Sequence, residues 1–325
     1  MNKNFFGGIA IAAMLATAFG ANAQSPADNG AAEPSTVYFI REISPESLVK
    51  IYKALGREAT GNVAVKISTG ESEKSHQLDP DLIADFVKEV NGTLVECNTA
   101  YDGNRRHTAE HLKAVEQRGY NRIAKVDIMD AAEEVAIPIK DGIHLDKDIV
   151  GKNFLNYDFL VVLSHLKGHQ MGGFGGALKN ISIGIASSNG KAYIHSAGKT
   201  ANADSIWRNI ADQDMFLESM ADACKGVIEH VGKDKALYIN VANNMSIDCD
   251  CNGNPAKPEM ADLGILASLD PVALDRASVD MILNADDPHK ASMIERINSR
   301  HGTHTIDVAE KHGLGTQNYK IVEIK

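Results

Sequence analysis

The sequence predicts an α/β protein with a mainly parallel sheet and helices on both faces of that sheet. Short apolar runs typical of buried strands alternate with segments of helical periodicity, which is the pattern of strand–helix–strand units. The most hydrophobic run, residues 159–163, is expected to be a central strand, because the middle of a parallel sheet is buried on both sides.

The elements can be followed along the chain from their periodicity and their end signals. Three helices have a polar N-cap candidate followed by proline at the first helical position: Ser44, Asp79 and Asp270. The segment that follows the glycine-rich loop fits both a helix and a strand, and we favour the helix. Strands are expected at 37–40, 63–67, 93–97, about 125–129, 159–163, 237–241, 263–268 and 319–324, with an added hairpin strand at 133–139. Helices are expected at 45–55, 80–90, about 106–118, most of 203–231, 271–283, 289–298 and 305–312.

Residues 1–23 have the features of a signal peptide. Lys3 precedes the apolar segment 5–19, and an Ala-x-Ala cleavage site ends at Ala23. We therefore expect an exported protein, periplasmic or secreted. No later run is long and apolar enough to span a membrane.

The rest of the chain is predicted to be a linker followed by one domain. Residues 24–36 are rich in Pro, Ala, Asn and Ser without periodicity and predict a disordered linker, and residues 37–325 predict a single α/β domain. Without Lys3 the formal net charge falls from −10 to −11. This acidic balance argues against nucleic acid and anionic membranes as partners.

One stretch concentrates chemically competent side chains directly after the expected central strand. Glycines let backbone N–H groups approach a ligand, and a following helix N-terminus attracts anions, so we expect a small anionic ligand here. The stretch fits no nucleotide-binding fingerprint. The candidate catalytic residues are His165, Lys167, His169 and Lys179, and the candidate ligand-binding residues are Gly172, Gly173, Gly175, Gly176 and Asn180.

A second candidate site is the loop Asp248, Cys249, Asp250 and Cys251. Two thiolates one residue apart, flanked by carboxylates, can share a metal ion, with Cys97 as a third thiol. A disulfide between the two loop cysteines is the alternative.

The two candidate sites are expected to form one crevice. Polar clusters follow the strands at 93–97, 159–163 and 237–241, and ligands bind beyond the carboxyl ends of parallel strands. We therefore expect His165, His169, Cys249 and Cys251 to converge. Of the scattered histidines, we single out His195 as a possible further site residue, because it follows an expected strand after the glycine loop.

Two blocks of this sequence resemble domain-of-unknown-function family 362, whose members are often labelled uncharacterised iron–sulfur centre proteins. The first block, 164–180, reads SHLKGHQMGGFGGALKN, and the second comprises the Asp-Cys-Asp-Cys loop and DLGILASLDPVALD at 262–275. Many relatives carry a ferredoxin-like insert with C-x-x-C-x-x-C runs between these blocks. In this sequence Cys224 is the only cysteine between residues 195 and 237, so we expect no ferredoxin-type [4Fe-4S] cluster. The resemblance implies the shared core, and it carries no reaction with it.

Three functions are compatible with these observations. The first is an exported protein whose crevice binds a metal or an anionic ligand, with Lys and His side chains available as acid–base groups of an enzyme. The second is a non-catalytic metal or redox-binding protein that uses the Cys-x-Cys pair with a redox partner. The third is a structural remnant that lost electron transfer together with the ferredoxin module.

Overall fold

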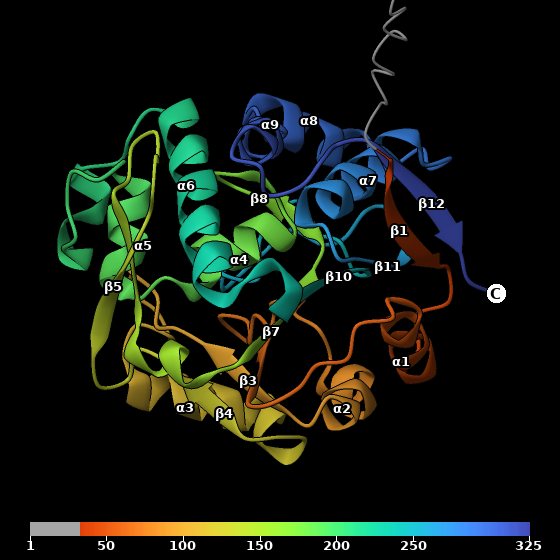
Figure 1. Cartoon of the computed structure of the whole chain (residues 1–325), viewed down its shortest axis with the longest axis horizontal. Helices are drawn as coiled ribbons and strands as arrows, with labels where there is room; N and C mark the ends of the chain where they lie inside the picture. The colour runs from red at the N-terminus through yellow and green to blue at the C-terminus, as the bar shows by residue number, and fades with distance from the viewer. Residues whose placement is uncertain (1–32) are drawn as a thin grey trace, which may run out of the picture. The chain divides into compact units, whose positions relative to one another are not determined.

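An eight-stranded sheet forms the centre of the computed structural model, which describes residues 33–325 (Figure 1). Of these eight strands only β11 runs antiparallel to its neighbours, and the other pairings are parallel. The strands lie in the order β12 (Tyr319–Glu323), β1 (Ser35–Ile40), β11 (Gly264–Ser268), β10 (Ala236–Ala242), β7 (Phe159–His165), β2 (Val63–Lys66), β3 (Gly92–Glu96) and β4 (Val126–Ile128). The predicted mainly parallel sheet is confirmed, and the run 159–163 lies in an interior strand.

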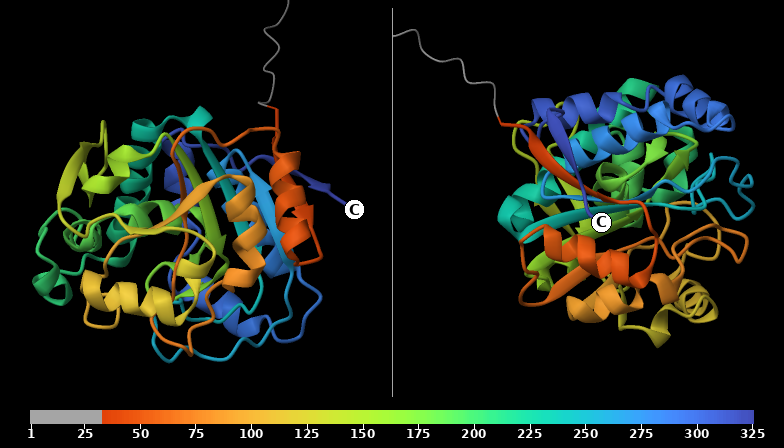
Figure 2. Two further views of the ribbon diagram at one scale, coloured as in Figure 1. Left: turned by 90° about the horizontal axis from the view of Figure 1, so that it is seen from below. Right: turned by 90° about the vertical axis from the view of Figure 1, so that its right-hand side faces the viewer.

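Helices cover both faces of the sheet because side chains alternate along each strand. In β7, Leu160 and Val162 pack into one apolar core, and Val161 and Leu163 pack into another. The first core contains residues of α4 (Ala177–Ile185), α6 (Gln213–Val231), α7 (Pro271–Asn284), α8 (Ala291–Ser299) and α9 (His304–Lys311). The second contains residues of α1 (Pro45–Ala54), α2 (Pro80–Glu89) and α3 (Thr108–Gln117). Figure 2 shows the two helical layers from other sides.

The three predicted N-caps are confirmed. Ser44 Oγ accepts a hydrogen bond from Ser47 N at 3.1 Å, and Asp79 caps α2 in the same way. Asp270 Oδ1 accepts hydrogen bonds from the first two free N–H groups of α7, each at 2.9 Å. These caps satisfy donors that the helix itself leaves unpaired. The helix favoured after the glycine loop is also present, as α4.

Several elements differ from the sequence prediction. The glycine stretch contains a hairpin of β8 (Lys167–His169) and β9 (Gly173–Gly175), and the expected strand at 133–139 pairs as β5 (Glu134–Pro138) with an unpredicted strand, β6 (Lys147–Gly151). His195 ends a helix, α5 (Ser188–His195), and does not follow a strand. Short 3-10 helices lie at Tyr120–Arg122, Lys152–Asn156, Ala203–Arg208 and Lys233–Lys235.

Of the predicted signal peptide and linker, residues 1–36, the structure describes only the last four residues. β1 begins at Ser35, so the last two residues of the predicted linker 24–36 belong to the sheet. The predicted signal peptide 1–23 lies outside the described residues. Within 33–325, no helix has both the length and the apolarity that crossing a membrane requires.

Candidate functional site

A cavity of about 560 Å³ opens where the strands β2, β3, β7 and β10 end. Its wall contains Lys66 from β2, Glu96 from β3, and Lys167 and His169 from β8, which follows β7. Asp250 and Cys251 come from the loop after β10. The three polar clusters that follow parallel strands therefore meet at one edge of the sheet, as the sequence predicted.

Close backbone contacts hold the loop after β10 against the β8–β9 hairpin. Gly168 N donates a hydrogen bond to Ser246 O at 2.8 Å. A Cβ added at Gly168 would lie 2.2 Å from Ile247 O, so only glycine permits this approach. On the other side, Glu71 N donates to Asp250 O at 2.8 Å. These contacts fix the position of the cysteine loop beside His169.

A buried ion-pair network forms one side of the cavity. Arg105 lies 3.1 Å from Glu71 and 3.1 Å from Glu96, and Lys66 lies 3.9 Å from Glu96. Burial alone raises the pKa of Glu96, but the Arg105 guanidinium and a hydrogen bond from His111 hold it well below its usual range. Glu96 is therefore a carboxylate that balances Arg105 and Lys66.

A second network links His165 and Lys167 to Asp250 in the loop of the two cysteines. Asp250 lies 2.8 Å from Lys167 Nζ and 2.9 Å from His165 Nδ1. Burial raises the pKa of Asp250, but the charges of Lys167 and His165 outweigh it, so that the pKa lies far below its usual range. The other ring nitrogen of His165 lies 2.6 Å from Asn243 O. Both nitrogens of His165 are thus engaged, and in the described chain His165 does not line the cavity.

Lys179 differs from the other three lysines that line the cavity. Lys66 Nζ donates to Asn180 Oδ1 at 3.2 Å, Lys167 Nζ donates to His165 O at 2.8 Å, and Lys191 Nζ donates to Ala186 O at 2.6 Å. Within residues 33–325, the amine of Lys179 has no hydrogen-bond or ion-pair partner. Lys179 thus presents a free amine to the cavity.

The pKa of Lys179 is lowered to about 7. Burial is the largest cause, followed by repulsion from Lys167, Lys66 and Arg105. Burial likewise lowers the pKa of Lys66 to about 8. The amine of Lys179 is therefore neutral in a large share of molecules at neutral pH.

Two neutral histidines in the cavity hold their protons on opposite ring atoms. His169 Nδ1 accepts hydrogen bonds from Gly172 N at 2.8 Å and Met171 N at 3.2 Å, so its proton resides on Nε2. His195 Nδ1 donates to Lys191 O at 2.7 Å, which leaves Nε2 as an acceptor. Burial lowers the pKa of His195 to about 4 and that of His169 well below its usual range. The cavity thus contains one imidazole donor and one imidazole acceptor.

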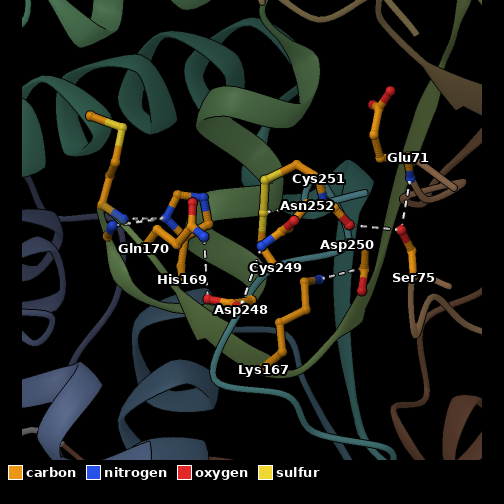
Figure 3. Close-up of a disulfide and its surroundings, with 12 residues drawn as sticks. Glu71, Ser75, Lys167, His169, Gln170, Asp248, Cys249, Asp250, Cys251 and Asn252 are labelled. Carbon is orange, nitrogen blue, oxygen red and sulfur yellow. Dashed lines mark hydrogen bonds and ion pairs between the residues drawn. A yellow bond between two sulfur atoms is a disulfide. The ribbon is translucent and has the colours of Figure 1, made fainter. Parts of the chain in front are cut away.

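The two loop cysteines are joined to each other. Figure 3 shows the Cys249–Cys251 disulfide beside His169, and potential ligand atoms of these three residues lie within 4.8 Å of one another. The predicted metal site is not formed in this arrangement, because a disulfide offers no thiolate and His169 Nε2 carries a proton. The flanking acids are also occupied: Asp250 pairs with Lys167, and Asp248 lies 3.1 Å from Arg296.

The remaining cysteines do not add ligands to this group. Cys97 and Cys224 are buried free thiols whose Sγ atoms donate to the backbone oxygens of Ile185 and Leu178. Burial raises the pKa of each thiol above its usual range. Cys97 lies outside the group formed by His169, Cys249 and Cys251, and its role as a further metal ligand stays a prediction. All four cysteines are described and they do not converge, so they do not fit an iron–sulfur cluster.

The predicted glycine loop lies away from the cavity lining, and ligand binding by its glycines stays a prediction. None of the four predicted glycines lines the cavity in the described structure. The free N–H groups at the start of α4 instead donate to the carboxylate of Asp275, from Ala177 N and Leu178 N at 2.8 Å each. An added Cβ at Gly176 would lie 2.4 Å from Asp275 Oδ1, so this glycine is needed for packing. Asn180 does line the cavity, but its amide is bonded to Lys66 O, Leu163 O and Ser164 Oγ.

Sequence reasoning missed four buried charged residues of the cavity: Lys66, Glu71, Arg105 and Lys191. The sequence does contain an indication for Lys66, because a charged residue within an apolar strand needs a buried partner or a cavity. Glu71, Arg105 and Lys191 lie in or after segments without strand periodicity, and only their contacts reveal them. His195, singled out for a different reason, does line the cavity.

Comparison with known proteins gives a family match and remote structural similarity. The pattern of the family described as "Domain of unknown function (DUF362)" matches residues 63–280. No curated protein matches the chain. Two similar solved structures are the lactate racemase apoprotein of Thermoanaerobacterium thermosaccharolyticum (17% identity, TM-score 0.36, 63% of this chain and 50% of that chain) and a protein of Thermotoga maritima (13% identity, TM-score 0.41, 82% and 58%). This chain thus spans between half and three fifths of these two proteins, and the similarity is too remote to carry a functional argument.

Proposed function

The chain belongs to the DUF362 family, and we propose that it binds a small anionic ligand, a carboxylate or a phosphate, in the cavity beyond the parallel strands. The observation that carries this proposal is the amine of Lys179, which faces the cavity without a partner among residues 33–325. A partly buried amine without a counter-charge is destabilised as a cation, and a bound anion supplies that counter-charge.

The charge distribution around the cavity supports the same ligand class. Four lysines and Arg105 line it, against three buried acids and one exposed acid, Asp102, at its edge. The buried acids already pair with Arg105, Lys66 and Lys167. Among residues 33–325, Lys179 and Lys191 therefore remain without acidic partners. A concave site with a few converging polar groups is the usual form of a small-molecule site.

We further propose that the site transfers a proton to or from its bound anion. The Nε2–H of His169 is a donor and the unprotonated Nε2 of His195 is an acceptor, and both rings line the cavity. A neutral donor and a neutral acceptor in one cavity are the components of general acid–base catalysis. This feature favours an enzyme over a binding protein.

The single tryptophan provides a direct test of ligand binding. Trp207 lines the cavity and is 63% exposed, so a bound ligand should change its fluorescence. We would titrate phosphate, oxalate and propionate while recording fluorescence, and measure the melting temperature at saturation. A ligand present at a hundred times its Kd should stabilise the fold by about 2.7 kcal/mol.

The matched variants are Lys179→Met, which removes the amine, and Lys113→Met, which removes an exposed lysine of α3. Lys113→Met should behave as the wild type, and Lys179→Met should lose most of the fluorescence and melting response. If none of the three anions changes either signal in the wild type, the anion-binding proposal is wrong.

A second candidate function is thiol–disulfide exchange at Cys249 and Cys251. Cys251 lines the cavity, so the pair is accessible from it, and a redox partner or a bound thiol could reach the sulfur. Reduction would also release two thiols beside His169, and metal binding by the reduced pair stays a prediction. The test is equilibration in glutathione buffers followed by thiol trapping and metal analysis. A disulfide that stays intact throughout the cellular range of redox potentials would exclude this function.

We also propose that residues 1–23 direct export, with cleavage after Ala23. The Lys3 n-region, the apolar segment 5–19 and the Ala-x-Ala site support this proposal. N-terminal sequencing of the protein from its native source should begin at Gln24. An intact N-terminus on protein recovered from the cytoplasm would contradict it.

A further inference from the structure

We infer that Lys179 forms an imine with the carbonyl carbon of a 2-oxo acid bound in the cavity. This inference rests on the proposed anion site and identifies the class of its ligand. It differs from that proposal in assigning a covalent bond to one named amine.

The hydrogen-bond pattern selects Lys179 from the four lysines of the cavity. Lys66, Lys167 and Lys191 each donate to a protein oxygen within 3.2 Å, and these hydrogen bonds hold each nitrogen in place at the cavity wall. Lys179 has no such partner among the described residues. Among the cavity lysines, Lys179 is therefore the one that can attack a carbonyl group without first breaking a hydrogen bond to another described residue.

The surroundings also make this amine nucleophilic. A lysine attacks carbonyl groups only when it is neutral, and burial among other cations is the usual means of producing a neutral lysine. The pKa of Lys179 is lowered to about 7 by burial and by Lys167, Lys66 and Arg105. The geometry and the charge environment thus favour the same residue.

The requirement for a carboxylate on the substrate follows from the same cations. Imine formation occupies the Lys179 nitrogen, so an anionic group on the ligand must be held by another cation of the cavity. Lys191 has no acidic partner in the described part of the chain, and its amine donates a hydrogen bond to Ala186 O at the cavity wall. A 2-oxo acid places its carboxylate next to its carbonyl, so one small molecule can engage both groups. The cavity volume of about 560 Å³ accommodates such an acid.

The reaction is balanced with groups that the cavity contains. The neutral Lys179 nitrogen attacks the carbonyl carbon, the carbonyl oxygen takes a proton, and a carbinolamine forms. His195, which holds the proton taken from the amine, gives it to that hydroxyl, which leaves as water. The second proton of the amine passes to His169, so that a carbon–nitrogen double bond and one water molecule form and both histidines regain their starting state. The Nε2–H of His169 is the donor for the oxygen, and Nε2 of His195 is the acceptor for the amine proton.

The experiment is reductive trapping on the full chain. Protein is incubated with pyruvate and sodium cyanoborohydride, and the intact mass and the modified peptide are determined. We expect one adduct per chain, on Lys179. The variant Lys179→Arg keeps a positive charge but forms no imine, and Lys113→Arg is the matched surface control. Circular dichroism confirms that both variants fold.

Several outcomes separate this inference from the anion site itself. Loss of the adduct in Lys179→Arg, with labelling retained in Lys113→Arg and slowed by propionate, supports the imine. If pyruvate raises the melting temperature of the wild type but leaves no adduct, the anion site stands and the imine is refuted. Labelling spread over surface lysines, and equal in Lys179→Arg, also refutes it. The absence of both an adduct and a melting response to any anion refutes both proposals.

Discussion

Replacing Lys179 with methionine should change how the stability of the protein depends on pH. The folded state holds Lys179 with a pKa lowered to about 7, mainly by burial. The unfolded chain keeps the ordinary lysine pKa of about 10.4. Between these values the unfolded chain binds more protons at this residue than the folded protein does. The free energy of unfolding should therefore rise with pH in this window.

The magnitude follows from proton linkage. One group that is neutral when folded and charged when unfolded contributes up to about 1.4 kcal/mol per pH unit. From pH 7.5 to 9 the wild type should thus gain up to about 2 kcal/mol relative to the Lys179→Met variant. Partial contact of the side chain with solvent reduces this value and leaves its sign unchanged.

The assay is urea unfolding of both proteins at several pH values in low salt. Subtracting the variant from the wild type cancels the other groups that titrate in this range. Lys113→Met serves as the control, and it should follow the wild-type curve. If the wild type and Lys179→Met show the same pH dependence, the amine is not buried among cations as described, and the reasoning fails.

Three further predictions come from contacts around the site. Burial raises the pKa of Asp275 to about 6, so the folded protein binds more protons there than the unfolded chain between about pH 4 and 6. The free energy of unfolding of the wild type should fall as pH rises through that window relative to Asp275→Asn, and parallel urea curves would contradict this. Gly176→Ala should destabilise the fold by about 1 to 3 kcal/mol, because its Cβ would lie 2.4 Å from Asp275 Oδ1; an unchanged melting temperature would refute this packing. The denatured, unreduced protein should show two reactive thiols and the reduced protein four, because Cys249 and Cys251 are paired; four thiols without reductant would refute the disulfide.

The sequence predicted the sheet and the location of the site because both depend on regular structure. Strands such as 159–163 are recognisable from apolar runs, and the carboxyl ends of parallel strands lie at one edge. The clusters around Glu96, His169 and Cys251 were placed together on that basis, and all three line one cavity.

The hydrogen-bond and ion-pair partners within the site could not be predicted from the sequence, because they depend on irregular segments. Asp275 accepts hydrogen bonds from N–H groups of α4 that lie about a hundred residues away in the sequence. The glycine-rich loop itself does not reveal that a carboxylate already occupies the N-terminus of the helix that follows it. The pairing of Arg105 with Glu71 depends on two loops without periodicity. Which lysine keeps a free amine is decided by such contacts, and so it required the structure.

The most direct test of the central claim is proton uptake on anion binding. We would titrate oxalate into the wild type at pH 8 by calorimetry, in two buffers with different ionisation enthalpies. Because the Lys179 amine is largely neutral at that pH, a bound anion should draw in close to one proton per chain, and Lys179→Met should draw in none. Oxalate binding without proton uptake, or equal uptake in the variant, would contradict the account.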